Sequence, residues 1–114
     1  MPFLDAKILD LPERYLGMVR DILREHVPDA EVWAYGSRVN GDSYEASDLD
    51  LVVRRPTELT KPTPDMGDLR EAFIESNLPI RVEVIDWARI PESFHREIEA
   101  GYVVLQGGSV TGRC

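Results

Sequence analysis

Residues 48–53 constrain the fold of this chain more than any other segment. They read DLDLVV, so two aspartates alternate with leucines before the pattern becomes fully apolar. Successive side chains of a strand point to opposite faces, which places Asp48 and Asp50 on one face and Leu49 and Leu51 on the other. The pattern therefore predicts a β-strand that packs its leucines on a core and carries an acidic face at its start.

The rest of the sequence predicts a small α/β or α+β domain. Apolar residues at helical spacing, bracketed by prolines and glycine, favour three helices, and short runs of strand formers favour three more strands. Residues 38–47 are polar with turn residues, and residues 54–64 hold three prolines and predict a loop. The expected helices cover about 11–26 and 66–77, and a third begins near Pro91 and ends before Gly101. The expected strands cover 31–35 and 80–86, and residues 102–105 form a last short strand or a packing segment.

The length of the chain limits the architecture. With 114 residues, of which 43% are hydrophobic, we expect one domain with a single modest core. No repeat or domain linker divides it, so the domain is predicted to span residues 1–107. The glycine-rich residues 108–114 are expected to form a flexible tail.

The charge and the cysteine count exclude several classes of protein. The formal net charge of −8 repels phosphate backbones on average, so we expect no direct binding of long nucleic acid. No apolar run approaches the roughly 18 residues of a membrane span, and no basic leader is present, so neither a membrane segment nor a secretory signal is expected. The single cysteine, Cys114, allows no disulfide framework, which favours a cytoplasmic protein.

Two short motifs carry chemical interest, and each is weak in isolation. The pair Asp48 and Asp50 could hold a cation between its carboxylates, although most such pairs are a solvated strand face. Gly36 and Ser37 follow the expected strand 31–35. Glycine permits close backbone approach and serine can offer a hydroxyl and an N–H to a phosphate, but an ordinary strand-to-turn junction looks the same.

The combination is more specific. The segment 35–53, YGSRVNGDSYEASDLDLVV, places Gly36-Ser37 ten residues before Asp48-Leu49-Asp50, and it resembles the signature of the polymerase-β-type nucleotidyltransferases. Gly41, Ser47 and the short chain are most similar to the minimal nucleotidyltransferases, a subgroup that includes antitoxins paired with HEPN-domain toxins. A weaker resemblance extends through IRVEVID and PESFHREIEAGYVVL, so it covers most of the chain.

The resemblance implies a third carboxylate on a later strand, beside the aspartate pair. Glu83 and Asp86 are the candidates, and because they are three residues apart in a strand, only one can face the site. By its position in the strand Glu83 is preferred, although the family more often has aspartate there. Asp48, Asp50 and Glu83 would then be the catalytic residues and would hold Mg²⁺, with two ions expected.

The resemblance also implies a nucleotide site and a function. Gly36, Ser37 and Arg38 are expected to grip the triphosphate of ATP. The expected fold is a mixed sheet flanked by about three helices. The expected activity is transfer of a nucleoside monophosphate, AMP from ATP, to an acceptor hydroxyl. A tyrosine of a HEPN-type toxin is the most specific candidate for that hydroxyl, and the acidic surface suits a basic partner.

Two alternatives stay open. The acceptor could be an aminoglycoside-like small molecule, or the chain could be a catalytically weak subunit that neutralises its partner by contact alone. Four further residues have simpler expected roles: Trp33 and Trp87 belong to the core, His26 ends the first helix, and His95 is an exposed helical residue with no zinc-ligand spacing.

Overall fold

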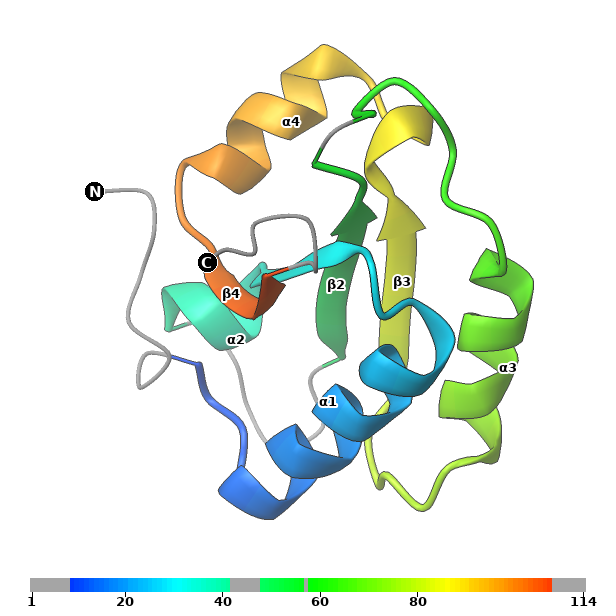
Figure 1. The fold of residues 1–114 in the computed structure, drawn as a ribbon. Coiled ribbons are helices and arrows are strands. Elements are labelled where there is room, and N and C mark those ends of the chain that lie inside the picture. Colours follow the sequence, from blue (N-terminus) through cyan, green and yellow to red (C-terminus); the bar gives the residue numbers. More distant parts are fainter. Residues whose placement is uncertain (1–8, 42–47, 57, 108–114) are drawn as a thin grey trace.

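The computed structural model describes residues 9–41, 48–56 and 58–107 and is drawn in Figure 1. The expected tail 108–114, Ser47 and the first eight residues of the expected domain lie outside this part of the chain. The elements, in chain order, are α1 (Glu13–His26), β1 (Glu31–Tyr35), α2 (Ser37–Asn40), β2 (Leu49–Arg54), α3 (Met66–Glu75), β3 (Val82–Asp86), the 3₁₀ helix η2 (Trp87–Arg89), α4 (Glu92–Glu99) and β4 (Val103–Gly107).

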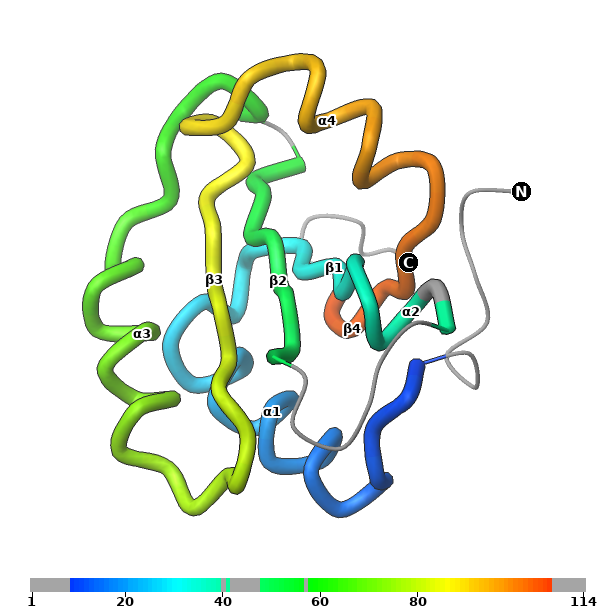
Figure 2. The backbone as a smooth tube through the Cα atoms, turned by 180° about the vertical axis from the view of Figure 1, so that it is seen from behind, coloured from blue at the N-terminus to red at the C-terminus, as the bar shows by residue number. Residues whose placement is uncertain are grey.

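The four strands form one mixed sheet in the order β3-β2-β1-β4. The central strand β1 is antiparallel to both β2 and β4, whereas β2 and β3 are parallel, as they lie side by side in Figures 1 and 2. A parallel pair needs a crossover connection, and α3 lies in that connection between β2 and β3. The expected mixed sheet is confirmed.

Helices α1 and α3 cover one face of the sheet. Their apolar stripes, which include Val19, Leu23, Leu69 and Phe73, pack with the sheet residues whose side chains point to that face. The leucines that alternate with the acidic pair are both fully buried here, as the pattern 48–53 predicted. The sheet residues of this larger cluster are Val32, Ala34, Leu49, Leu51, Val53, Val84, Val103 and Leu105.

The opposite face carries a smaller cluster under α4, at the top of Figure 1. Trp33, Val52, Trp87 and Ile98 are its buried members, so the expectation that both tryptophans belong to the core is confirmed. The expectation that His95 is exposed is wrong. Its ring stacks on Trp87 at a centroid separation of 3.8 Å and its Nε2 lies 2.8 Å from the Trp87 carbonyl oxygen, because α4 turns this side of the helix toward η2.

Two other features differ from the sequence-based expectation. Residues 37–40 form the short helix α2 rather than a plain turn, and it ends at Gly41, whose φ of 90° is left-handed. Arg54, whose place after residues 48–53 suggests either a solvated strand end or a charge that steers phosphate, is largely buried: it pairs with Glu31, and its guanidinium lies 4.4 Å from the ring centroid of Trp33. Among the helices of the described residues, none has the length and apolar character to cross a membrane.

Candidate active site

Three side chains form a row across the sheet on the face that α4 covers. In the antiparallel pair Tyr35 lies opposite Asp50, and in the parallel pair Asp50 lies beside Glu83. Directly paired residues of neighbouring strands project from the same face. The next row along the strands, Trp33, Val52 and Ile85, belongs to the smaller cluster. The acidic row therefore begins where the apolar packing ends.

Asp48 adds a third carboxylate just before β2. It is exposed, whereas Asp50 is half-buried. Burial raises the pKa of the Asp50 carboxyl above its usual value, and the negative charges of Asp48 and Glu83 raise it further. Like charges held this close are unfavourable unless a proton or a cation lies between them, so the arrangement is suited to a bound cation.

Gly36 brings the backbone into direct contact with this group. Its φ is 85° and its ψ is −153°, a combination essentially confined to glycine. A Cβ atom at this position would lie 2.6 Å from Oδ2 of Asp50, which is too close for any side chain. Glycine is therefore required twice, by its conformation and by the carboxylate beside it. It also precedes Ser37, the half-buried first residue of α2.

Glu83 is the most exposed member of the row. Its side chain is 48% exposed, and Oε1 lies 3.4 Å from a guanidinium nitrogen of Arg81. Among the residues described, no three Asp, Glu, His or Cys side chains already converge as a metal site. Repulsion between the carboxylates and the ion pair to Arg81 both favour this open arrangement.

Comparison with known proteins supports the chemistry that this geometry suggests. The family model described as a nucleotidyltransferase domain matches residues 16–106, which is most of the chain. The chain belongs to the nucleotidyltransferase family. It is also 45% identical over 98 residues to a Haemophilus influenzae protein named "Probable protein adenylyltransferase MntA", a match that covers 86% of this chain and 84% of that protein.

The family assignment confirms two expectations made from the motif. The chain is a minimal nucleotidyltransferase of the polymerase-β-like superfamily, and its mixed sheet with flanking helices is the fold expected for it. The chain is accordingly an enzyme of the nucleotidyltransferase class.

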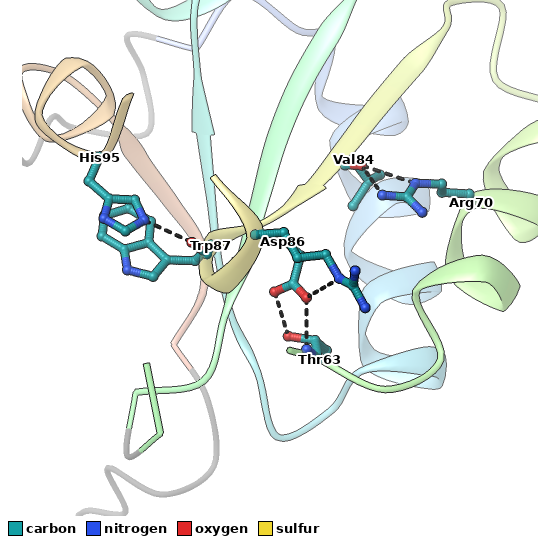
Figure 3. A network of polar contacts seen from close by, with 7 residues as sticks. Thr63, Arg70, Val84, Asp86, Trp87 and His95 are labelled. Carbon is teal, nitrogen blue, oxygen red and sulfur yellow. Dashed lines mark hydrogen bonds and ion pairs between the residues drawn. The ribbon is translucent and has the colours of Figure 1, made fainter. Parts of the chain in front are cut away.

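The nucleotidyltransferase places its two candidates for a third acid on opposite faces. Glu83 lies beside Asp50, whereas Asp86 is buried with 2% exposure and has structural partners. Thr63 donates to Asp86 through its backbone N–H at 2.9 Å and its hydroxyl at 3.2 Å, and Arg89 lies 3.6 Å away (Figure 3). Through these hydrogen bonds, Asp86 connects the loop before α3 to the end of β3.

Arg38, expected to help grip a triphosphate, is a buried residue of α2. It is 4% exposed, and its guanidinium donates to the carbonyl oxygen of Asp10. The Asp10 N–H in turn donates to the Arg38 carbonyl oxygen at 2.7 Å. These contacts attach the segment before α1 to α2.

Tyr35 and Arg81 adjoin the carboxylates, although their residue types alone did not single them out. Burial raises the pKa of the Tyr35 hydroxyl to about 12, with further contributions from Asp50 and Glu83, so this hydroxyl stays protonated near neutral pH. Both residues could be found from their positions relative to the carboxylates along the strands. Tyr35 is the last residue before Gly36, and Arg81 is two residues before Glu83.

Proposed function

We propose that this nucleotidyltransferase transfers AMP from ATP to a hydroxyl group in a Mg²⁺-dependent reaction. The observation that carries the proposal is the pair Asp50 and Glu83 on adjacent strands, with Asp48 just before β2 and the backbone of Gly36 against Asp50. The printed name of the Haemophilus influenzae relative, a protein adenylyltransferase, supports ATP as the nucleotide and a protein as the acceptor.

The donor set fits Mg²⁺. Asp48, Asp50 and Glu83 offer only carboxylate oxygens, which are the ligands hard divalent cations prefer, and they leave room for phosphate and water. When bound, Mg²⁺ neutralises the charge of the triphosphate and of the displaced pyrophosphate. Burial raises the pKa of Asp50 and the neighbouring carboxylates raise it further, and a bound cation would offset the repulsion among these carboxylates.

The remaining groups position the reactants. Gly36 allows the triphosphate to approach the backbone, and the hydroxyl and N–H of Ser37 can donate to it at the first turn of α2. Arg38 contributes here by holding α2 to the segment before α1. Glu83, whose side chain is 48% exposed, would accept the proton of an incoming hydroxyl.

We propose that the acceptor is a tyrosine of a partner protein, with a HEPN-type toxin as the specific candidate, so that the chain acts as an antitoxin. The net charge of −8 favours a basic partner, as an RNA-cleaving toxin would be.

The experiment is transfer of radioactive label from [α-³²P]ATP to the protein encoded beside this chain, with Mg²⁺. Wild type should label that protein, and Asp48→Asn should reduce labelling by at least a hundredfold while still forming the complex. Omission of Mg²⁺ should have the same effect as the substitution. Labelling that survives in Asp48→Asn would contradict the proposed role of this carboxylate.

The same experiment tests the contact-only alternative. Glu83, in place of the aspartate more usual in the family, is the feature that favours it. If the partner is neutralised equally by wild type and Asp48→Asn, without transfer of label, then binding rather than catalysis is the function. Labelling of an aminoglycoside instead of the protein would point to the small-molecule alternative.

A further inference from the structure

A cavity of about 400 Å³ opens beside the carboxylates, between α2 and α4. Gly36 forms part of its wall and also contacts Asp50, so the cavity and the acidic row are continuous. Its size falls in the range of pockets that hold small ligands. Its walls include Tyr35, Phe94, Glu97 and Ala100.

The walls of the cavity combine aromatic surface with one charged group. The rings of Tyr35 and Phe94 meet edge to face, with centroids 5.8 Å apart and planes at 85°. Buried Val39 and Ile98 supply further apolar surface. Such walls suit a flat heteroaromatic ring, which gains from both burial and contact with an aromatic face.

Glu97 determines which end of a nucleotide fits this cavity. An ionised carboxylate accepts hydrogen bonds and donates none, so it repels phosphate and attracts an amino group. With Mg²⁺ held by Asp48, Asp50 and Glu83 to offset its charge, the triphosphate would lie toward Gly36 and Asp50, which leaves the Glu97 end of the cavity for the base. The phosphates are then at the acidic row, where transfer would take place.

We propose that this cavity binds the base of the nucleotide and that Glu97 selects a purine with an exocyclic amino group, as in adenine. The inference rests on the proposed nucleotidyl transfer and adds to it the residue that sets base preference. Inosine triphosphate tests this choice, because it differs from ATP in carrying a 6-oxo group, an acceptor, in place of the 6-amino group.

The first test compares Glu97→Gln with Glu99→Gln, an exposed control on the same helix that does not line the cavity. Binding of ATP and of inosine triphosphate to the full chain is measured by calorimetry with Mg²⁺. Glu97→Gln should weaken the binding of ATP about tenfold, the effect expected for losing one charged hydrogen bond. The same substitution should not weaken the binding of inosine triphosphate. An unchanged preference between the two nucleotides would overturn the role of Glu97.

The second test fills the cavity. Ala100→Trp places a large ring in it, and Glu99→Trp adds the same ring to the same end of α4 outside it. Ala100→Trp should weaken the binding of ATP more than tenfold, whereas the Glu99→Trp variant should bind ATP as tightly as wild type does. Equal ATP binding by both variants would overturn the site.

Binding and transfer are measured separately, so the two proposals fail in different ways. If wild type binds ATP through this cavity but labels no acceptor, the cavity assignment stands and the proposed transfer fails. If wild type transfers label and neither substitution changes ATP binding, the cavity assignment alone fails. A wild-type protein that binds no ATP would contradict both.

Discussion

At the scale of one residue, Gly36 adopts a backbone conformation that brings the chain against the carboxylate of Asp50. Its φ of 85° and the predicted 2.6 Å approach of a Cβ to Asp50 Oδ2 are separate penalties. Gly41 shares only the first, because its φ is 90° and a Cβ there would meet nothing within 4 Å. Gly17, within α1, carries neither penalty.

These glycines allow a matched set of substitutions. Gly41→Ala should lower the free energy of unfolding by roughly 1–2 kcal/mol, the usual cost of a left-handed alanine. Gly36→Ala should lower it by at least ~1 kcal/mol more and reduce transfer about a hundredfold, because Asp50 must move. Gly17→Ala should raise it by ~0.5–1 kcal/mol, as in other helices. Urea denaturation measures all three, and equal losses for Gly36→Ala and Gly41→Ala would show that contact with Asp50 has no cost.

Asp50 is expected to reduce the stability of the metal-free protein. Its pKa in the folded chain is raised above the ordinary 3.8, so the ionised form is disfavoured by folding. The penalty is present above the folded pKa and disappears as the pH falls through it, because the folded carboxyl takes up its proton first. Stability linked to this group is therefore lost as the pH rises.

Asp50→Asn should consequently raise Tm at pH 7 without metal, because the amide carries no charge for folding to disfavour. The difference from wild type should shrink as the pH approaches 4. The same variant should transfer no label. Thermal unfolding between pH 4 and 8 measures the effect, and a Tm below that of wild type at pH 7 would contradict it.

At the scale of elements, sequence patterns predict the helices and strands that short-range interactions stabilise. The acid–leucine alternation of residues 48–53 predicts β2 and its faces, and prolines with apolar spacing predict α1 and α4 within about two residues. Helix α2 escapes prediction because four residues, three of them Ser, Arg and Asn, offer no apolar periodicity. Its position depends on Gly36 and on contacts with the segment before α1.

The distinction between Glu83 and Asp86 depends on contacts distant in sequence. Alternation shows that they face opposite ways, but strand register decides which one lies beside Asp50. The loop residue Thr63 then shows why the other is buried. The partial burial of His95 escapes prediction for the same reason, because the sequence does not reveal that its ring stacks on Trp87.

These different settings of Asp86 and Glu83 predict effects of different size on stability. Asp86→Asn should lower the free energy of unfolding by about 1–3 kcal/mol, because the buried carboxylate loses charged hydrogen bonds with Thr63. Glu83→Gln should change it by no more than ~0.5 kcal/mol, since the side chain is exposed. Chemical denaturation of both variants decides the matter, and a larger loss for Glu83→Gln would contradict the assignment.

At the scale of the whole molecule, an acidic chain concentrates three carboxylates at one end of its sheet. The net charge of −8 adds to the local repulsion, so a divalent cation should stabilise the protein as a whole. Mg²⁺ at a hundred times its dissociation constant should raise the free energy of unfolding by about 2.7 kcal/mol. Asp48→Asn should lose most of that increase. Equal stabilisation of both proteins in thermal unfolding would place Mg²⁺ elsewhere.

The most direct test of the account is the rate of label transfer from [α-³²P]ATP by wild type, Glu83→Gln and Asp86→Asn, each corrected for its folded fraction. The proposed site predicts at least a hundredfold loss in Glu83→Gln and a rate within tenfold of wild type in Asp86→Asn. A rate retained by Glu83→Gln and lost by Asp86→Asn would contradict the site described here.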